Sequence, residues 1–265
     1  MKSLVELKAD SAFRNVRMYR IFGIERLFQL INGEELALLA PRKWEDPYEK
    51  ALQDMLETQN NFRSYGLCWS SRSRSDALWR IYSPNSLGVR VSTTIGHLTD
   101  AILPNNSFSE ENFFMGAVSY LPEKTSFPNR MFDFGKNKLS LNQRDFNRRI
   151  VTISDALKDM AAAKNRHRST SDIAKTFLVK RKAFDHESEM RFIYVDGNNN
   201  GSDGNIYKIP IDPFKLISTI QFDPRMNDDV YEALRKAILA SASPHKITIS
   251  KSDLYKSPEE LIDSK

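Results

Sequence analysis

The sequence predicts an α+β fold, because several short strand-like segments occur together with segregated helical segments. A chain of 265 residues can form one large domain or two small ones, and we expect a single domain over residues 1–265. The hydrophobic fraction of 40% and the charged fraction of 28% are typical of a soluble globular protein.

The strands and helices follow from the spacing of apolar residues. Residues 16–22 place Arg17 and Tyr19 on one side of the first predicted strand and Arg20 on the other. Further strands are expected at 35–39, 65–70, 88–93, 113–121, 186–195, 205–211, 216–222 and 246–250. Helices are expected at 23–32, 75–82, 94–102, 139–164, 169–178 and 227–240.

Capping residues mark two helix ends. Gly33 stands where the helix at 23–32 needs a C-terminal cap. Asp46 as N-cap, Pro47 at the first helical position and Glu49 three residues after Asp46 match a capping box. This structural role is sufficient to explain Glu49, and a catalytic role is the less favoured alternative.

Positive charge is concentrated in the middle of the chain, which has a net charge of +5 overall. Between Pro122 and Lys182 there are 15 Lys and Arg against 6 Asp and Glu, a local net charge of +9. No linker-like composition flanks 122–182, so we expect a helical insertion there. Such a segment favours RNA, DNA or an acidic protein as partner, and the alternative is a solvated helical face.

The sequence shows no signal for export or membrane insertion. No apolar run approaches the ~20 residues that span a bilayer, and residues 1–8 lack the apolar core of a signal peptide. Cys68 is the single cysteine, so no intrachain disulfide can form. We therefore expect a cytoplasmic protein without a membrane partner.

Two carboxylates open the strand predicted at 186–195. On a strand, Glu187 and Glu189 would stand side by side, since residues i and i+2 share a face. Like charges so close raise each other's pKa unless a cation or a substrate uses them, and Arg191 continues the same face. The segment is either a solvated strand end with a Glu–Arg pair or part of a functional site.

Several other kinds of site lack support in the sequence. The four His and one Cys have no metal-ligand spacing, so no metal site is expected. There is no glycine-rich phosphate loop and no nucleophile elbow. A nuclease that holds a divalent ion between Glu187 and Glu189 stays open, although no third acid is in an obvious register.

The remaining polar residues suit cleavage of a glycosidic bond in an anionic cofactor. Arg20 offers a fork of donors for phosphate or ribose oxygens, and Ser70 can hold a sugar. A carboxylate beneath a sugar stabilises an oxocarbenium-like transition state. Nearby aromatic residues can stack on a ring or pack in the core: Tyr19, Trp69, Trp79 and Tyr82.

Five motifs occur in the order found in a known family. They are Tyr19-Arg20, Trp44-Glu45-Asp46-Pro47-Tyr48-Glu49, Leu67-Cys68-Trp69-Ser70, Leu78-Trp79-Arg80-Ile81-Tyr82 with Gly88-Val89, and His186-Glu187-Ser188-Glu189-Met190-Arg191. Together they resemble the uncharacterised bacterial domain family numbered 2971. Its pattern runs Tyr-Arg, Asn-Asp-Pro-Phe-Glu, Cys-Phe-Ser, Trp-x-x-Tyr with Gly-Val, and Tyr-Glu-x-Glu-x-Arg. Glu45, Trp69 and His186 depart from that pattern.

The order of an arginine, a serine and Glu-x-Glu is also similar to that of ADP-ribosyltransferases, many of them toxins. That resemblance implies a fold of two small packed sheets with flanking helices, and NAD as the substrate. It implies that Arg20 holds the dinucleotide and that Ser70 orders the nicotinamide ribose. Glu189 would contact the 2′-hydroxyl and stabilise the cation, and Glu187 would assist the acceptor nucleophile. Ser70 and Ser71 stand where the family has Ser-Thr-Ser, so Ser71 can substitute for Ser70.

The family numbered 2971 has no assigned activity, and the second resemblance implies an NAD-dependent mono-ADP-ribosyltransferase that acts as a bacterial toxin or phage-defence effector. Its acceptor would be RNA or DNA bound through 122–182, and an antitoxin protein would be a partner. In that case Glu189→Gln abolishes transfer and leaves the melting temperature nearly unchanged. One alternative is a nucleic-acid-binding or metal-dependent nuclease module of a defence system, and another is a non-catalytic interaction protein.

Overall fold

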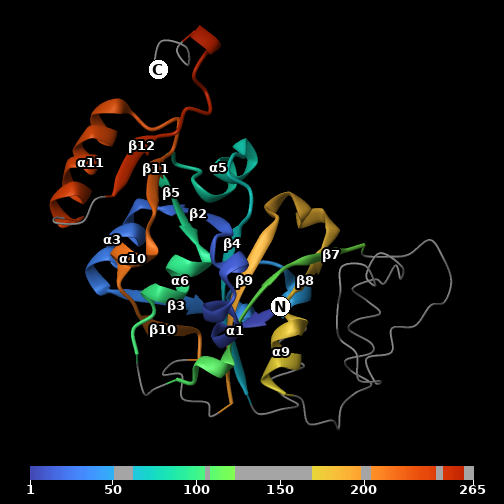
Figure 1. Ribbon diagram of the computed structural model, residues 1–265. Helices are drawn as coiled ribbons and strands as arrows, with labels where there is room; N and C mark the ends of the chain where they lie inside the picture. Colours follow the sequence, from blue (N-terminus) through green and yellow to red (C-terminus); the bar gives the residue numbers. More distant parts are fainter. Residues whose placement is uncertain (51–61, 105–107, 123–168, 198–203, 243–246, 260–265) are drawn as a thin grey trace. The chain divides into compact units, whose positions relative to one another are not determined.

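The chain forms two compact units, each built from segments that are far apart in the sequence (Figure 1). A computed structural model describes residues 1–50, 62–104, 108–122, 169–197, 204–242 and 247–259. The first unit comprises Met1–Glu6, Ala37–Cys68 and Asn106–Lys208, and the second comprises Leu7–Leu36, Trp69–Asn105 and Ile209–Lys265. Most of the predicted insertion at 122–182, including the helix expected at 139–164, lies outside the described residues.

The first unit is built on a sheet with the strand order β1-β6-β9-β4-β3-β10. These strands are β1 (Lys2–Ser3), β3 (Glu35–Leu39), β4 (Arg63–Ser70), β6 (Phe113–Ala117), β9 (Glu189–Asp196) and β10 (Ile206–Pro210), and the unit boundary falls within β3, β4 and β10. Strand β6 runs antiparallel to both β1 and β9. A separate parallel pair joins β7 (Ser119–Leu121) to β8 (Val179–Arg181). The unit also contains η1 (Pro41–Lys43), η2 (Glu110–Asn112), α9 (Thr170–Thr176) and η3 (Lys182–Glu187).

Helix α9 and the large sheet enclose the core of the first unit. Ser169 caps α9, because its side chain accepts a hydrogen bond from the Asp172 amide. The buried cluster beneath the helix consists of Phe62, Phe114, Ile173, Ala174, Phe177, Leu178, Ile193 and Val195. These apolar contacts hold β9, which carries the predicted site residue Glu189, against α9.

The second unit is built on a sheet with the order β2-β5-β11-β12, beside which lies the end of β4. The strands are β2 (Arg17–Gly23), β5 (Gly88–Thr94), β11 (Thr219–Phe222) and β12 (Thr248–Lys251). Strand β5 is antiparallel to β2 and β11, and β11 is parallel to β12. The helices are α2 (Ser11–Arg14), α3 (Ile24–Gly33), α5 (Asp76–Tyr82), α6 (Ile95–Ala101), α10 (Pro213–Leu216) and α11 (Asp228–Ala242), and α1 (Leu4–Ala9) spans the boundary between the units.

The sheet of the second unit has one apolar face and one polar face. Met18, Val91 and Ile220 have no exposed surface, and they come from three neighbouring strands. The alternate residues Tyr19 and Ser92 are paired across β2 and β5 and therefore lie on the opposite face. Arg20 shares the Met18 face because strand side chains alternate.

The α+β fold class is confirmed, and most expected elements occur within a few residues of their predicted bounds. Three details of the prediction are wrong. The left-handed residue after α3 is Glu34 (φ 49°) and not Gly33, which is the last helical residue. The strand expected at 113–121 is broken into β6 and β7. The strand expected at 216–222 begins only at Thr219, because residues 213–216 form the short helix α10 before it. Among the described residues, no helix is both long and apolar enough to cross a membrane.

Candidate functional site

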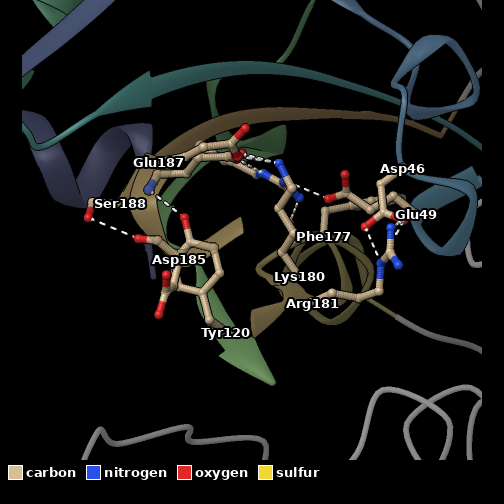
Figure 2. Close-up of polar contacts among 11 residues, drawn as sticks. Asp46, Glu49, Tyr120, Phe177, Lys180, Arg181, Asp185, Glu187 and Ser188 are labelled. Carbon is tan, nitrogen blue, oxygen red and sulfur yellow. Dashed lines mark hydrogen bonds and ion pairs between the residues drawn. The ribbon is translucent and has the colours of Figure 1, made fainter. Parts of the chain in front are cut away.

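The first unit contains a buried network of charged side chains that comes from four segments (Figure 2). Strand β9 supplies Glu189 and Arg191, and η3 supplies Glu187. Lys180 comes from β8, and Glu49 comes from the helical residues 47–50. These five residues are no more than 7% exposed, so the segment is not the solvated strand end that the sequence left open.

Glu189 is held at both carboxylate oxygens. Lys180 Nζ lies 2.6 Å from Oε1, and Arg191 Nε lies 2.6 Å from Oε2. The Glu189 amide donates a hydrogen bond of 2.8 Å to the Tyr120 hydroxyl, which fixes the backbone at the start of β9. A carboxylate with two charge-assisted hydrogen bonds has a fixed position and orientation before any ligand arrives.

Glu187 reaches the network in a different way from that predicted. The strand begins at Glu189, and Glu187 is the last residue of η3. Ser188 between them adopts a left-handed conformation (φ 45°), and its amide donates to the Asp185 carbonyl at 3.2 Å. Strand alternation therefore does not bring the two carboxylates together. They meet because both bind Lys180 Nζ.

Arg191 connects the Glu-x-Glu segment to the Trp44–Glu49 motif. Its Nη2 lies 2.5 Å from Glu49 Oε1, and its Nη1 donates to the Phe177 carbonyl at 2.7 Å. Its guanidinium carbon lies 4.4 Å from the centre of the Trp44 ring, which is cation–π geometry. The predicted pairing of Arg191 with one glutamate of the pair is confirmed, and Glu49 is a second partner.

The predicted capping box is confirmed only at its N-cap. Asp46 Oδ1 accepts a hydrogen bond of 3.0 Å from the Tyr48 amide. Asp46 also pairs with Arg181 Nη2 at 3.0 Å (Figure 2). The Glu49 carboxylate pairs with Arg191. Glu49, which the local spacing assigned to the capping box, therefore forms a long-range ion pair with Arg191.

The environments of the two glutamates drive their pKa values apart. Burial and the hydrogen bond with Glu189 raise the pKa of Glu187 to about 7, although Lys180 opposes this shift. Burial also disfavours ionised Glu189, but Arg191 and Lys180 outweigh it and hold its pKa well below the usual range. At neutral pH the site therefore contains one permanent carboxylate beside one that exchanges its proton, a pattern that suits acid–base work.

The same geometry argues against a divalent metal ion between the two carboxylates. Lys180 Nζ bonds to both Glu187 and Glu189, so its ammonium group occupies the position that a shared metal ion would take. Burial disfavours the charged amine, but the two carboxylates raise the pKa of Lys180, so it remains a cation at neutral pH. Among the residues that the structure describes, no group of three metal-binding side chains occurs.

The predicted dinucleotide contacts all belong to the second unit. Arg20 lies on β2, with its guanidinium carbon 5.5 Å from the centre of the Phe22 ring. Ser70 ends β4 directly opposite Tyr19 and accepts a hydrogen bond from the Arg72 amide at 3.1 Å. Ser71 is exposed in the loop that follows.

The predicted aromatic contacts separate into two groups. Tyr19 and Trp79 line one cavity in the second unit, and Trp79 is only 1% exposed. Tyr82, at the end of α5, is 45% exposed and does not line that cavity. Arg20 and Tyr19 point to opposite faces of β2, so they do not contribute to the same wall of the sheet.

Sequence reasoning missed Lys180, Tyr120 and Trp44 as members of the network in the first unit. Lys180 was counted only as part of the basic segment, because nothing in its spacing distinguishes it from its neighbours Arg181 and Lys182. The available signal is the alternation of side chains along β8. On this short strand the Lys180 side chain points to the face opposite to Val179 and Arg181.

Comparison with known proteins finds solved structures of DarT from Thermus sp. 2.9. Its complex with NAD+ matches with 12% sequence identity and a TM-score of 0.38, over 91% of this chain and 97% of that one. Its complex with ADP-ribosylated ssDNA matches with 11% identity and a TM-score of 0.38, over 91% and 96% of the two chains. No protein-family model and no curated protein matches the chain, the family numbered 2971 included. The roles proposed below rest on the residues of this chain and on the resemblance seen in its sequence.

Proposed function

We propose that the protein is an NAD-dependent mono-ADP-ribosyltransferase. The observation that carries the proposal is the pair of buried glutamates, of which Glu189 stays ionised while the pKa of Glu187 is about 7. Transfer of ADP-ribose needs a fixed negative charge near the ribosyl cation and a group that accepts the proton of the nucleophile. Glu189 and Glu187 supply these two functions in that order, which matches the roles implied by the sequence resemblance.

In the proposed reaction the bond between nicotinamide and ribose C1′ breaks, and its electron pair leaves with the nicotinamide. The Glu189 carboxylate stabilises the oxocarbenium-like transition state electrostatically. The acceptor forms a new bond to C1′ and its proton moves to Glu187. Lys180 and Arg191 are positioning residues, because they hold Glu189 and do not themselves react.

The contacts to NAD are assigned from the sequence resemblance. Arg20 is proposed to hold the dinucleotide, and Ser70 or Ser71 to order the nicotinamide ribose. Tyr19 and Trp79 line a cavity, which supports a ligand-binding role for them, and Tyr82 offers an exposed ring. The acceptor is proposed to be RNA or DNA because of the net charge of +9 in residues 122–182. A role as a toxin or defence effector with an antitoxin partner follows from the resemblance alone.

The deciding experiment is incubation of the full chain with labelled NAD and separate RNA, DNA and protein pools. We expect label in one pool, and we expect Glu189→Gln to lower transfer by about 100-fold or more, as loss of transition-state electrostatic stabilisation typically does. The variant is also expected to lose on the order of 3 kcal/mol of stability, because Lys180 and Arg191 lose a buried partner. The structure thus replaces the sequence-based expectation of an unchanged melting temperature.

Asp223→Asn is the matched control for that loss of stability. Asp223 is fully buried in the second unit and pairs with Arg225 Nη2 at 2.7 Å, so the variant also breaks a buried ion pair. Transfer measured well below the melting temperature should persist in this control. Equal loss of transfer in both variants would mean that Glu189 acts through stability alone, and no label in any pool would refute the proposed activity.

A further inference from the structure

The polar face of the sheet in the second unit is hollowed into a cavity of about 310 Å³. Strands β2, β5 and β11 form its floor, and α5 and residues 252–254 contribute to its walls. The lining residues are Arg17, Tyr19, Ser73, Arg74, Trp79, Arg90, Ser92, Thr219, Gln221, Ser252, Asp253 and Leu254. The face of a sheet that points away from the core usually faces water. A cavity on that face, lined by charged, polar and aromatic side chains, is therefore a candidate ligand site.

The lining of this cavity is positively charged. Three arginines, Arg17, Arg74 and Arg90, face one carboxylate, Asp253, which gives a net charge of +2. Asp253 is already engaged, because its Oδ1 lies 3.1 Å from Arg74 Nη1. The charges of Arg17 and Arg90 are therefore not balanced by another lining carboxylate, and an anionic ligand would complement them.

Arg90 has an unused donor. Its Nε is buried and has no hydrogen-bond partner among the described residues. Its guanidinium carbon lies 5.1 Å from the centre of the Tyr19 ring, which fixes the direction of the side chain without satisfying that donor. A buried donor left without an acceptor is costly, and an oxyanion is the acceptor that a guanidinium fork binds best.

The rest of the lining suits a small polar molecule. Ser92 and Thr219 present hydroxyls that bond to each other at 2.6 Å, and Gln221 adds an amide. The volume lies at the lower end of the range of about 300–1,000 Å³ that small-molecule sites occupy. This volume is adequate for a mononucleotide, so the proposed ligand is a small molecule.

We propose that this cavity binds a phosphate-bearing small molecule, with Arg90 and Arg17 holding the phosphate. The cavity is lined by residues of the second unit, and Arg20 lies on the other face of β2. Its lining includes Tyr19 and Trp79, which are also proposed to contact NAD, so the proposal deepens the proposed function and in this respect rests on it. It concerns equilibrium binding and requires no chemistry at Glu189.

The test is isothermal titration of the full chain with AMP, inorganic phosphate and adenosine. AMP is expected to bind and adenosine is not, because only AMP carries the phosphate. Tighter binding of AMP than of inorganic phosphate identifies a nucleotide as the ligand class, and equal binding identifies phosphate alone. Arg90→Gln and Arg17→Gln should each weaken binding of AMP by about ten-fold or more, since each removes a charge-assisted contact.

Arg235→Gln on α11 is the matched control, because it removes one positive charge from the same unit at an exposed position outside the cavity. It should leave binding within two-fold or so of the unaltered chain, with circular dichroism to verify that all three variants fold. Adenosine binding as tightly as AMP would overturn the proposal. So would equal weakening by all three variants, or Arg90-dependent binding of a short oligonucleotide with none of AMP. Because no variant touches Glu189, failure here and failure of the proposed transfer are separate results.

Discussion

At the scale of single residues, Lys180 determines what the two glutamates can do. Lys180 bonds to both Glu187 and Glu189, whereas Arg191, among the described residues, bonds to Glu189 and not to Glu187. Burial favours the protonated form of both glutamates, but at Glu189 the two cations Arg191 and Lys180 outweigh it, whereas at Glu187 Lys180 does not, so the two pKa values diverge.

The pH dependence of stability is expected to report on Glu187. Its folded pKa of about 7 lies above the ordinary glutamate value of 4.5, so between these values the folded chain binds more protons than the unfolded chain. Stability from this group is therefore complete below pH 4.5 or so and is lost as the pH rises through 7. Glu189 has a lowered pKa and is ionised in both states across this window.

Glu187→Gln should remove that dependence, because glutamine does not titrate. Urea unfolding of the original chain and of the variant between pH 5 and 8 measures the difference, which should change by on the order of 2 kcal/mol across the window. Parallel stability curves for the two proteins would show that Glu187 titrates normally.

At the scale of elements, the network depends on a close approach between β4 and the segment that follows β3. A Cβ added at Gly66 would lie 2.6 Å from Cζ2 of the Trp44 ring, which itself stacks on the Arg191 guanidinium. Glycine at position 66 thus allows the ring to lie against the strand and support Arg191 from one side. The ion pairs of Arg191 with Glu49 and Glu189 then fix the orientation of the guanidinium group.

Gly66→Ala is accordingly expected to destabilise the protein by about 1–3 kcal/mol, since either the indole or the strand must shift. Gly33→Ala serves as the comparison. Nothing lies within 4 Å of a Cβ at that helical position, so alanine should be neutral or stabilising by up to about 1 kcal/mol. Urea denaturation of both variants measures the two changes, and equal effects would show that the Trp44 contact is not limiting.

At the scale of the whole molecule, the charge is divided between a basic middle segment and an acidic remainder. Residues 122–182 have a net charge of +9 and the chain has +5, so the rest has −4. The proposed binding of a polyanion therefore rests on the charge of one segment and not on the overall charge. Nucleic-acid binding through that segment should weaken steeply with salt, because each phosphate contact releases counterions.

Replacing Arg144, Arg148 and Arg149 by glutamine should lower the affinity for a labelled oligonucleotide and flatten its dependence on salt by about two to three units of logarithmic slope. Replacing three basic residues of α3 and α11, namely Arg26, Arg235 and Lys236, removes the same charge elsewhere and should have a much smaller effect. Titrations by fluorescence anisotropy between 50 and 200 mM salt or so provide the measurement. Identical slopes for both triple variants would exclude the basic segment as the contact.

The sequence by itself determined the α+β class, most elements and the N-cap Asp46, because apolar periodicity and capping side chains act locally. It also indicated that Glu187, Glu189 and Arg191 belong together. Only the tertiary structure decided how they meet, because that depends on Lys180 from β8, Glu49 from another segment and the left-handed turn at Ser188. It likewise decided which face of β2 lines a cavity, since the alternation of Arg17, Tyr19 and Arg20 defines two faces without saying which one packs against the core. Contacts between residues that are distant in the sequence depend on the packing of the elements, and local patterns do not encode that packing.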